Sequence, residues 1–143
     1  MQVRTATEQQ ALLMFYMANQ ENGFYPTDYS FEQATHDLAT WNVLPVFHHN
    51  QPVGAFIQQG PEFHVGVRSC AQKRWLTFGH LDKTINQTVK DYGYICTKAP
   101  VVWPDSVIIV PKLERWGFVE WKRDSRFVWY WMTSPWQPQK KTR

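Results

Sequence analysis

The stretch Glu62–Gly93 limits the fold of this chain most, because its hydrophobic period changes partway along it. In Glu62–Val67 apolar residues alternate with others, and Phe63, Val65 and Val67 share one face. Such alternation is typical of a strand with one buried face. The sequence therefore predicts a strand over Glu62–Val67, and the change of period after it predicts a helix.

That helix covers Thr77–Tyr92, where apolar residues recur every three or four positions. Thr77 is suited to cap its start, and Gly93 stands where a left-handed C-terminal cap belongs. The apolar positions are Phe78, Leu81, Ile85, Val89 and Tyr92.

A short basic turn joins the strand to the helix and carries Arg68, Lys73 and Arg74. A strand that turns directly into a helix leaves backbone N–H groups unpaired, and it places the positive end of the helix dipole beside them. The turn is therefore a candidate anion-binding site.

Two capping boxes precede this stretch. Thr5–Glu8 opens a predicted helix over Ala6–Asn19, and Ser30–Gln33 opens a second helix that ends at about Thr40. The residues Gln20–Asp28 between them, with a glycine and a proline, predict a loop.

Two strands are predicted next, over Val43–Phe47 and Val53–Ile57, joined by a turn of four or five residues at His48–Pro52. Pro45 cannot donate a hydrogen bond and favours either an edge position or an irregular start for the first of them. With Glu62–Val67, three antiparallel strands come before the central helix.

After that helix, Tyr94–Thr97 is a predicted strand, and strand–helix–strand implies that it runs parallel to Glu62–Val67. A short helix follows over Val110–Trp116. We expect Gly117 to end it at positive φ, with Trp116 and Phe118 buried. The strands Phe118–Lys122 and Phe127–Met132 form a closing hairpin around Arg123–Arg126.

Composition indicates one domain over residues 1–136, followed by a basic, solvated tail over residues 137–143. The net charge is +3, but Lys140, Lys141 and Arg143 lie in the last four residues, and without them 12 basic residues face 12 acidic ones. A neutral body argues against broad nucleic-acid binding, which needs a clustered positive field. No apolar run approaches the roughly 18 residues of a membrane span, and we expect no secretory signal.

The order of predicted elements resembles the GCN5-related N-acetyltransferase (GNAT) fold over roughly Asn42–Met132. The strand–turn–helix of Val65–Leu81 lies where that family binds the pyrophosphate of acetyl-CoA. Leu113–Phe118 is similar to the helix end before the family's sixth strand, and Trp129–Met132 ends a similar hairpin. More narrowly, the turn from Val67 to Lys73–Trp75 and the later Trp116–Phe118 resemble those of small acetyltransferase-like proteins of tailed phages. Internal virion proteins of short-tailed coliphages are one group of these.

The resemblance implies an α+β (α/β) fold, with a mixed, mostly antiparallel, twisted sheet of about six to seven strands, a central parallel pair and about four helices. It implies acetyl-CoA as cofactor if the protein is active, and otherwise none. The cofactor-binding residues that it implies are Val65, Val67, Gln72, Lys73, Arg74, Trp75, Leu76 and Thr77.

In an active enzyme Glu62 or His64 would act as the general base that takes a proton from an amine. A backbone N–H of their strand would polarise the acetyl carbonyl. The alternative is that Glu62 is a surface charge at a strand end and His64 a polar strand residue.

Three marks of the family are missing. Larger residues such as Lys73 and Trp75 replace the glycines that let backbone N–H groups approach phosphates. Leu113 stands where the family often has a tyrosine that acts as the general acid. No asparagine lies between Ala99 and Gly117 to hold the cofactor arm.

Other residues allow two interpretations. Lys73 and Arg74 either clamp phosphates or are solvated turn charges. His48 and His49 adjoin a turn without a third metal ligand, so we expect no metal site. Cys70 lies in the basic turn but without a histidine placed beside it, and we interpret it as an inert thiol.

The aromatic content is 16%, with eight tryptophans, and many lie near the end of the chain. They favour packing in a core or an interface over stacking on bases. We therefore expect a catalytically degenerate GNAT-fold protein that acts through protein contacts or self-association of its aromatic hairpin, with no membrane. The alternative is an active acetyl-CoA-dependent N-acetyltransferase. The tryptophans near the end of the chain are Trp121, Trp129, Trp131 and Trp136.

We expect the protein in the cytoplasm, or, for a phage protein, in the host cytoplasm or the virion.

Overall fold

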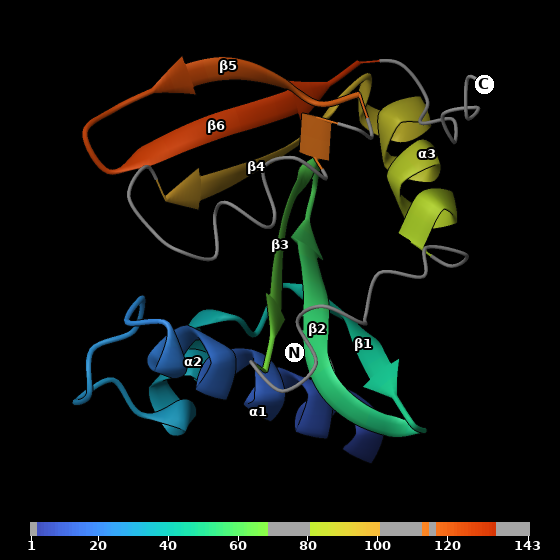
Figure 1. Ribbon diagram of the computed structural model, residues 1–143. Coiled ribbons are helices and arrows are strands. Elements are labelled where there is room, and N and C mark those ends of the chain that lie inside the picture. The colour runs from blue at the N-terminus through green and yellow to red at the C-terminus, as the bar shows by residue number, and fades with distance from the viewer. Residues whose placement is uncertain (1–2, 69–80, 101–112, 115–116, 134–143) are drawn as a thin grey trace. The chain divides into compact units, whose positions relative to one another are not determined.

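A computed structural model describes residues 3–68, 81–100, 113–114 and 117–133 of the chain (Figure 1). In this part it contains three helices and one six-stranded sheet in the order β1-β2-β3-β4-β6-β5. The chain divides into two compact units. The described residues up to Gln59 and His64–Arg68 belong to the first, and Gly60–Phe63 and the described residues from Leu81 onward belong to the second. Strand β3 (Glu62–Val67) therefore begins in one unit and ends in the other.

The first helix of the first unit, α1 (Ala6–Glu21), begins at the predicted capping box. The Thr5 hydroxyl accepts a hydrogen bond from the Glu8 amide at 3.1 Å, and the Glu8 carboxylate accepts one from the Thr5 amide at 2.9 Å. The predicted start is confirmed, and the helix continues two residues beyond the predicted Asn19.

The second helix, α2 (Phe31–Asp37), is shorter than the predicted helix to Thr40. After it the Trp41 amide donates to the Leu38 carbonyl, three residues back, at 3.0 Å. The guanidinium of Arg4 donates to the carbonyl oxygens of Leu38 and Trp41, at 2.7 Å each. Because a side chain distant in sequence satisfies these carbonyls, the chain can leave the helix early.

Strands β1 (Asn42–His48) and β2 (Gln51–Gln59) pair antiparallel through a two-residue turn. The predicted turn of four or five residues was wrong, because His49 and Asn50 both adopt positive φ, 52° and 64°. Two positive φ values are what the tightest hairpin turns require. The prediction from Pro45 is confirmed, since β1 lies at the edge of the sheet.

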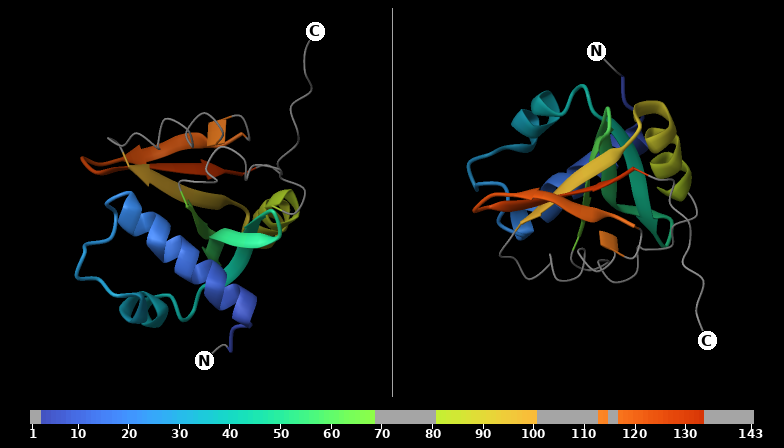
Figure 2. Two further views of the ribbon diagram at one scale, coloured as in Figure 1. Left: turned by 60° about the horizontal axis from the view of Figure 1, so that its bottom comes forward. Right: turned by 90° about the horizontal axis from the view of Figure 1, so that it is seen from above.

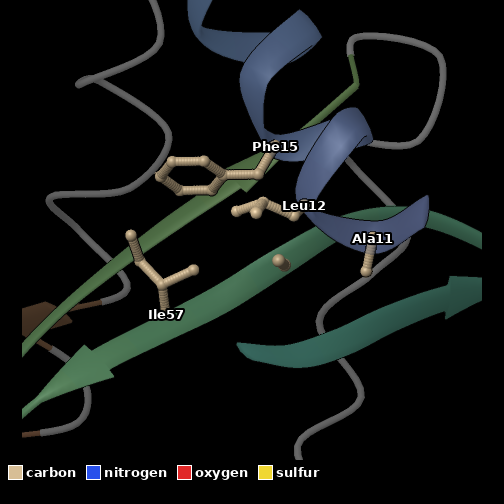
Figure 3. Packing of buried hydrophobic residues seen from close by; sticks show 5 residues of the cluster. Ala11, Leu12, Phe15 and Ile57 are labelled. Atoms are coloured by element: carbon tan, nitrogen blue, oxygen red, sulfur yellow. The ribbon is translucent and has the colours of Figure 1, made fainter. Parts of the chain in front are cut away.

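The core of the first unit lies between α1 and the strands β1 and β2. Side chains of α1 pack on residues of β2, as Figure 3 shows for four labelled residues. They form a cluster of five buried residues, each no more than 4% exposed. Burial of such side chains contributes about 25 cal/mol for each Å² removed from water. The cluster consists of Ala11, Leu12, Phe15, Ala55 and Ile57.

Two glycines set how closely the backbones of this unit approach. A Cβ on Gly54 would lie 2.1 Å from the Gly66 carbonyl oxygen and 2.7 Å from the Cα of Val67. A Cβ on Gly66 would lie 2.7 Å from the Phe15 ring of α1. Gly54 thus lets β2 lie against β3, and Gly66 lets α1 lie against β3.

We expect Gly54→Ala to lower the free energy of unfolding by roughly 1–3 kcal/mol, because the new methyl group overlaps backbone atoms that cannot rotate away. Urea unfolding followed by circular dichroism measures it. Gly93→Ala is the control, since an added Cβ there meets nothing within 4 Å and only the positive φ of 86° opposes it. A loss at Gly54 no larger than the control's would contradict the close approach.

The second unit pairs the start of β3 with β4 (Ile95–Pro100), in parallel, with Glu62 opposite Cys96. The predicted parallel neighbours are confirmed, although β4 extends three residues beyond Thr97. Helix α3 (Leu81–Tyr92) connects these strands within the described residues and ends at Gly93, whose φ is 86°. No helix in the described ranges is long and apolar enough to span a membrane.

Strands β5 (Val119–Arg123) and β6 (Phe127–Met132) form the predicted hairpin, and β6 lies beside β4 (Figure 2). Gly117 has φ of 99°, as predicted, and Phe118 is 1% exposed. The predicted burial of Trp116 and most of the predicted helix Val110–Trp116 lie outside the described residues.

Gly117→Ala should lower the free energy of unfolding by about 1 kcal/mol, because an L-residue is strained at this φ. The measurement is the midpoint of urea unfolding, compared between variants whose free energy of unfolding depends equally on urea concentration. Phe118→Leu serves as a comparison, since it changes packing without changing backbone strain. An unchanged midpoint for Gly117→Ala would show that the positive φ carries no cost.

Candidate functional site

The start of β3, in the predicted catalytic region, is held to β4 by two hydrogen bonds. The Cys96 amide donates to the Pro61 carbonyl at 2.8 Å, and the Thr97 hydroxyl donates to the Phe63 carbonyl at 2.7 Å. These two bonds fix the parallel contact that brings Glu62 opposite Cys96.

The carboxylate of Glu62 affects the thiol of Cys96. Burial and, after it, the negative charge of Glu62 raise the pKa of Cys96 to about 11, while the positive charge of Lys122 acts in the opposite direction. Because its pKa is so high, the thiol is protonated at neutral pH and is a poor nucleophile.

The second predicted base, His64, lies on the part of β3 that belongs to the first unit. Its ring is half-buried and lies 5.5 Å from the ring of Trp41, centroid to centroid. Of the predicted cofactor-binding residues on this strand, Val65 is half-buried and Val67 is 5% exposed. The structure thus places Glu62 and His64 two residues apart on one strand, each with different neighbours.

Arg68, the first basic residue of the turn, is engaged in an ion pair. Its guanidinium donates to both carboxylate oxygens of Glu21, at 2.9 and 3.1 Å. The sulfur atoms of Met14 and Met17 lie 3.8 and 3.6 Å from the same side chain. A paired guanidinium of this kind anchors the end of β3 to α1.

The remaining predicted cofactor residues, Gln72–Thr77, lie outside the described residues, as does Cys70. Leu113 is described and is 2% exposed. An apolar side chain in the core cannot donate a proton, so Leu113 cannot act as an acid.

His48 and His49 stack beside the turn of β1 and β2, with ring centroids 4.0 Å apart. Across the ranges that the structure describes, no three His, Cys, Asp or Glu side chains gather closely enough to hold a metal ion.

The second unit has a sheet face rich in aromatic side chains. Along β6 burial alternates: Val128, Tyr130 and Met132 are buried, whereas the residues between them are half-buried. The indole of Trp131 stacks on that of Trp121 in β5, with centroids 5.3 Å apart and planes at 19°. Trp121 is 43% exposed. We name this face, defined by Phe127, Trp129, Trp131, Trp121, Lys98 and Lys122, the aromatic face.

Two lysines complete the aromatic face. Lys98 and Lys122 lie directly opposite Trp129, one on each neighbouring strand. Their ammonium groups are 5.4 and 5.1 Å from the centroid of its ring. The tryptophans were predicted from the sequence, but the lysines were not, because only the strand register shows that they flank one ring.

Comparison with solved structures identifies the fold. The chain matches a ribosomal-protein-alanine N-acetyltransferase from Brucella melitensis with a TM-score of 0.65 at 16% identity, covering 92% of this chain and 98% of that one. An acetyltransferase from Thermus thermophilus matches with a TM-score of 0.63 at 15% identity, covering 90% and 92%. A PaiA N-acetyltransferase from Thermoplasma acidophilum, solved with coenzyme A, matches with a TM-score of 0.56 at 10% identity, covering 89% and 88%.

The chain has the GNAT fold. The mixed sheet with one parallel pair is the arrangement that the sequence predicted. No protein-family model matches the sequence, and neither does any curated protein.

The electrostatic coupling at Cys96 gives a paired test. In a Cys70→Ser background, we expect Glu62→Gln to lower the pKa of Cys96 from about 11, because it removes a negative charge. Lys122→Gln should raise that pKa, because it removes a positive one. The chemical shift of a ¹³C-labelled Cys96 β-carbon, followed against pH, reports both.

The control is Glu120→Gln, whose carboxylate is bonded to Arg123 at 2.9 Å and is not among the charges that shift the thiol. Equal shifts in all three variants, or shifts of the opposite sign, would refute the coupling.

Proposed function

We propose that this chain is a GNAT-fold protein that has lost acetyl transfer and acts through contacts with another protein. The observation that carries the proposal is the aromatic face, where the stacked pair Trp121–Trp131 lies on the solvent side of the hairpin. Exposed groups of large apolar residues on a protein surface commonly mark partner sites. Truncation of a tryptophan in such a site often costs about 2 kcal/mol or more of binding free energy.

Loss of catalysis is supported by the residues at the family's functional positions. Leu113 is buried and apolar where an acid is usual. In the sequence Lys73 and Trp75 replace loop glycines, and side chains of this size would crowd a pyrophosphate. These residues do not fit acetyl-CoA, and we derive no catalytic step through it.

The narrower resemblance to acetyltransferase-like proteins of tailed phages agrees with this proposal. Such a protein would work in the host cytoplasm or as an internal component of the virion. In either place the protein would act by binding another protein and not by forming a small-molecule product.

The second candidate function is acetyl-CoA-dependent transfer of an acetyl group to an amine. It is favoured by the fold, because the similar structures described above are named as acetyltransferases and one was solved with coenzyme A. Glu62, half-buried at the start of β3, would be the general base. Release of free coenzyme A in the presence of polyamines or peptide amines would favour this function.

The deciding experiment is calorimetric titration with acetyl-CoA and coenzyme A. We expect a dissociation constant above roughly 100 μM, about −5.5 kcal/mol or weaker, because the sequence has Lys73 and Trp75 in place of the glycines that admit phosphates. Trp75→Gly is the matched variant, and it should bind more tightly than the natural chain. A low-micromolar constant for the natural chain would overturn the proposal in favour of the enzyme.

A further inference from the structure

We propose that the aromatic face binds an acidic, extended segment of a partner protein, whose carboxylates meet Lys98 and Lys122 on either side of Trp129. This inference rests on the proposed function, because it names the chemistry of the partner. It begins from the register of three strands. Lys98 of β4 and Lys122 of β5 are both paired with Trp129 of β6.

The two ammonium groups are held in place by aromatic rings. Lys98 lies 4.2 Å from the centroid of Phe127 as well as 5.4 Å from that of Trp129. Lys122 lies 4.7 Å from the centroid of Trp121 and 5.1 Å from that of Trp129. Cation–π contacts restrain long side chains, and less rotamer entropy is then lost when an anion binds.

Glu62 lies opposite Cys96, and Glu120 and Asp124 lie on the hairpin. Hydrogen bonds from backbone amides, and to a lesser extent the charge of Lys98, lower the pKa of Asp124. Glu120 is bonded to Arg123 at 2.9 Å, and Asp124 accepts the amides of Arg126 and Phe127 at 2.8 and 2.7 Å. The ion pairs among the described residues join Arg68 to Glu21 and Arg123 to Glu120, and neither pair involves Lys98 or Lys122. The aromatic face therefore presents two positive charges that a carboxylate-bearing ligand complements.

The same contacts disfavour a single-stranded nucleic acid. Proteins that bind single strands on a sheet offer open aromatic rings on which bases stack. Here lysines and Arg126 lie over Phe127 and Trp129, and Trp121 and Trp131 stack on each other. The face offers cations backed by rings rather than free stacking platforms.

Apolar residues beside the lysines define the rest of the ligand. Trp131 lies opposite Val119, which is 58% exposed, and it stacks on Trp121. Trp129 and Trp131 are two positions apart on one strand, which corresponds to about 7 Å. An extended segment with a carboxylate and an apolar side chain at alternate positions, two residues apart, matches that spacing.

The test uses a fluorescein-labelled peptide that repeats Glu-Ser-Leu-Ser, which in an extended conformation places Glu and Leu two residues apart on one face. Fluorescence polarisation is the readout. We expect the natural chain to bind it, and the affinity to fall as salt is added. The double variant Lys98→Gln with Lys122→Gln should bind it at least about tenfold more weakly. The control is Lys83→Gln with Lys90→Gln, which removes the same charge from exposed positions of α3 and should leave the affinity unchanged.

A charge-conserving double variant, Lys98→Arg with Lys122→Arg, should retain binding and shows that any loss comes from charge rather than misfolding. The proposal is overturned if a peptide that repeats Lys-Ser-Leu-Ser binds as tightly, or if the α3 variant loses as much affinity as the Lys98 and Lys122 variant. Tighter binding of an oligothymidylate than of the acidic peptide would also overturn it. None of these outcomes alters the titration with acetyl-CoA, so the loss of catalysis is judged separately.

Discussion

The second unit of this protein depends on the short parallel contact between the start of β3 and β4. The Cys96 amide and the Thr97 hydroxyl each donate to a carbonyl of the chain entering β3, at 2.8 and 2.7 Å. Because β4 is fixed there, its next residue on the same face, Lys98, is fixed opposite Trp129 of β6. The position of a positive charge on the aromatic face thus follows from one backbone and one side-chain hydrogen bond, made by the two residues before Lys98.

A β-bulge on β5 has a comparable role. The register between β5 and β6 shifts between Glu120 and Lys122. In a regular strand, neighbouring side chains point to opposite faces of the sheet. A bulge turns two neighbouring side chains toward the same face. As a result, Trp121 stacks on Trp131 while Lys122, the next residue, reaches Trp129. Regular pairing would place only one of these two side chains on the aromatic face.

Local sequence signals predicted most of the fold, since both capping boxes, the positive φ of Gly117 and the closing hairpin depend on neighbouring residues. Of the misses, the tight turn between β1 and β2 depends on the local positive φ of His49 and Asn50, whereas the early end of α2 depends on a non-local contact. Arg4 ends α2 early by binding carbonyls more than thirty residues away. The candidate site was predicted less well, because Lys98 and Lys122 meet at Trp129 only through strand register and a bulge, which no local pattern reveals.

The central claim is that the functional surface is the aromatic face and not the cofactor strand of the GNAT fold. Amide chemical shifts of ¹⁵N-labelled protein test it most directly, with acetyl-CoA and the Glu–Leu peptide added to separate samples. The account predicts that the peptide shifts amides of β4, β5 and β6, whereas acetyl-CoA at equimolar concentration leaves Val65 and Val67 unmoved. Saturating shifts of Val65 and Val67 with equimolar acetyl-CoA, without any response of β6 to the peptide, would contradict it.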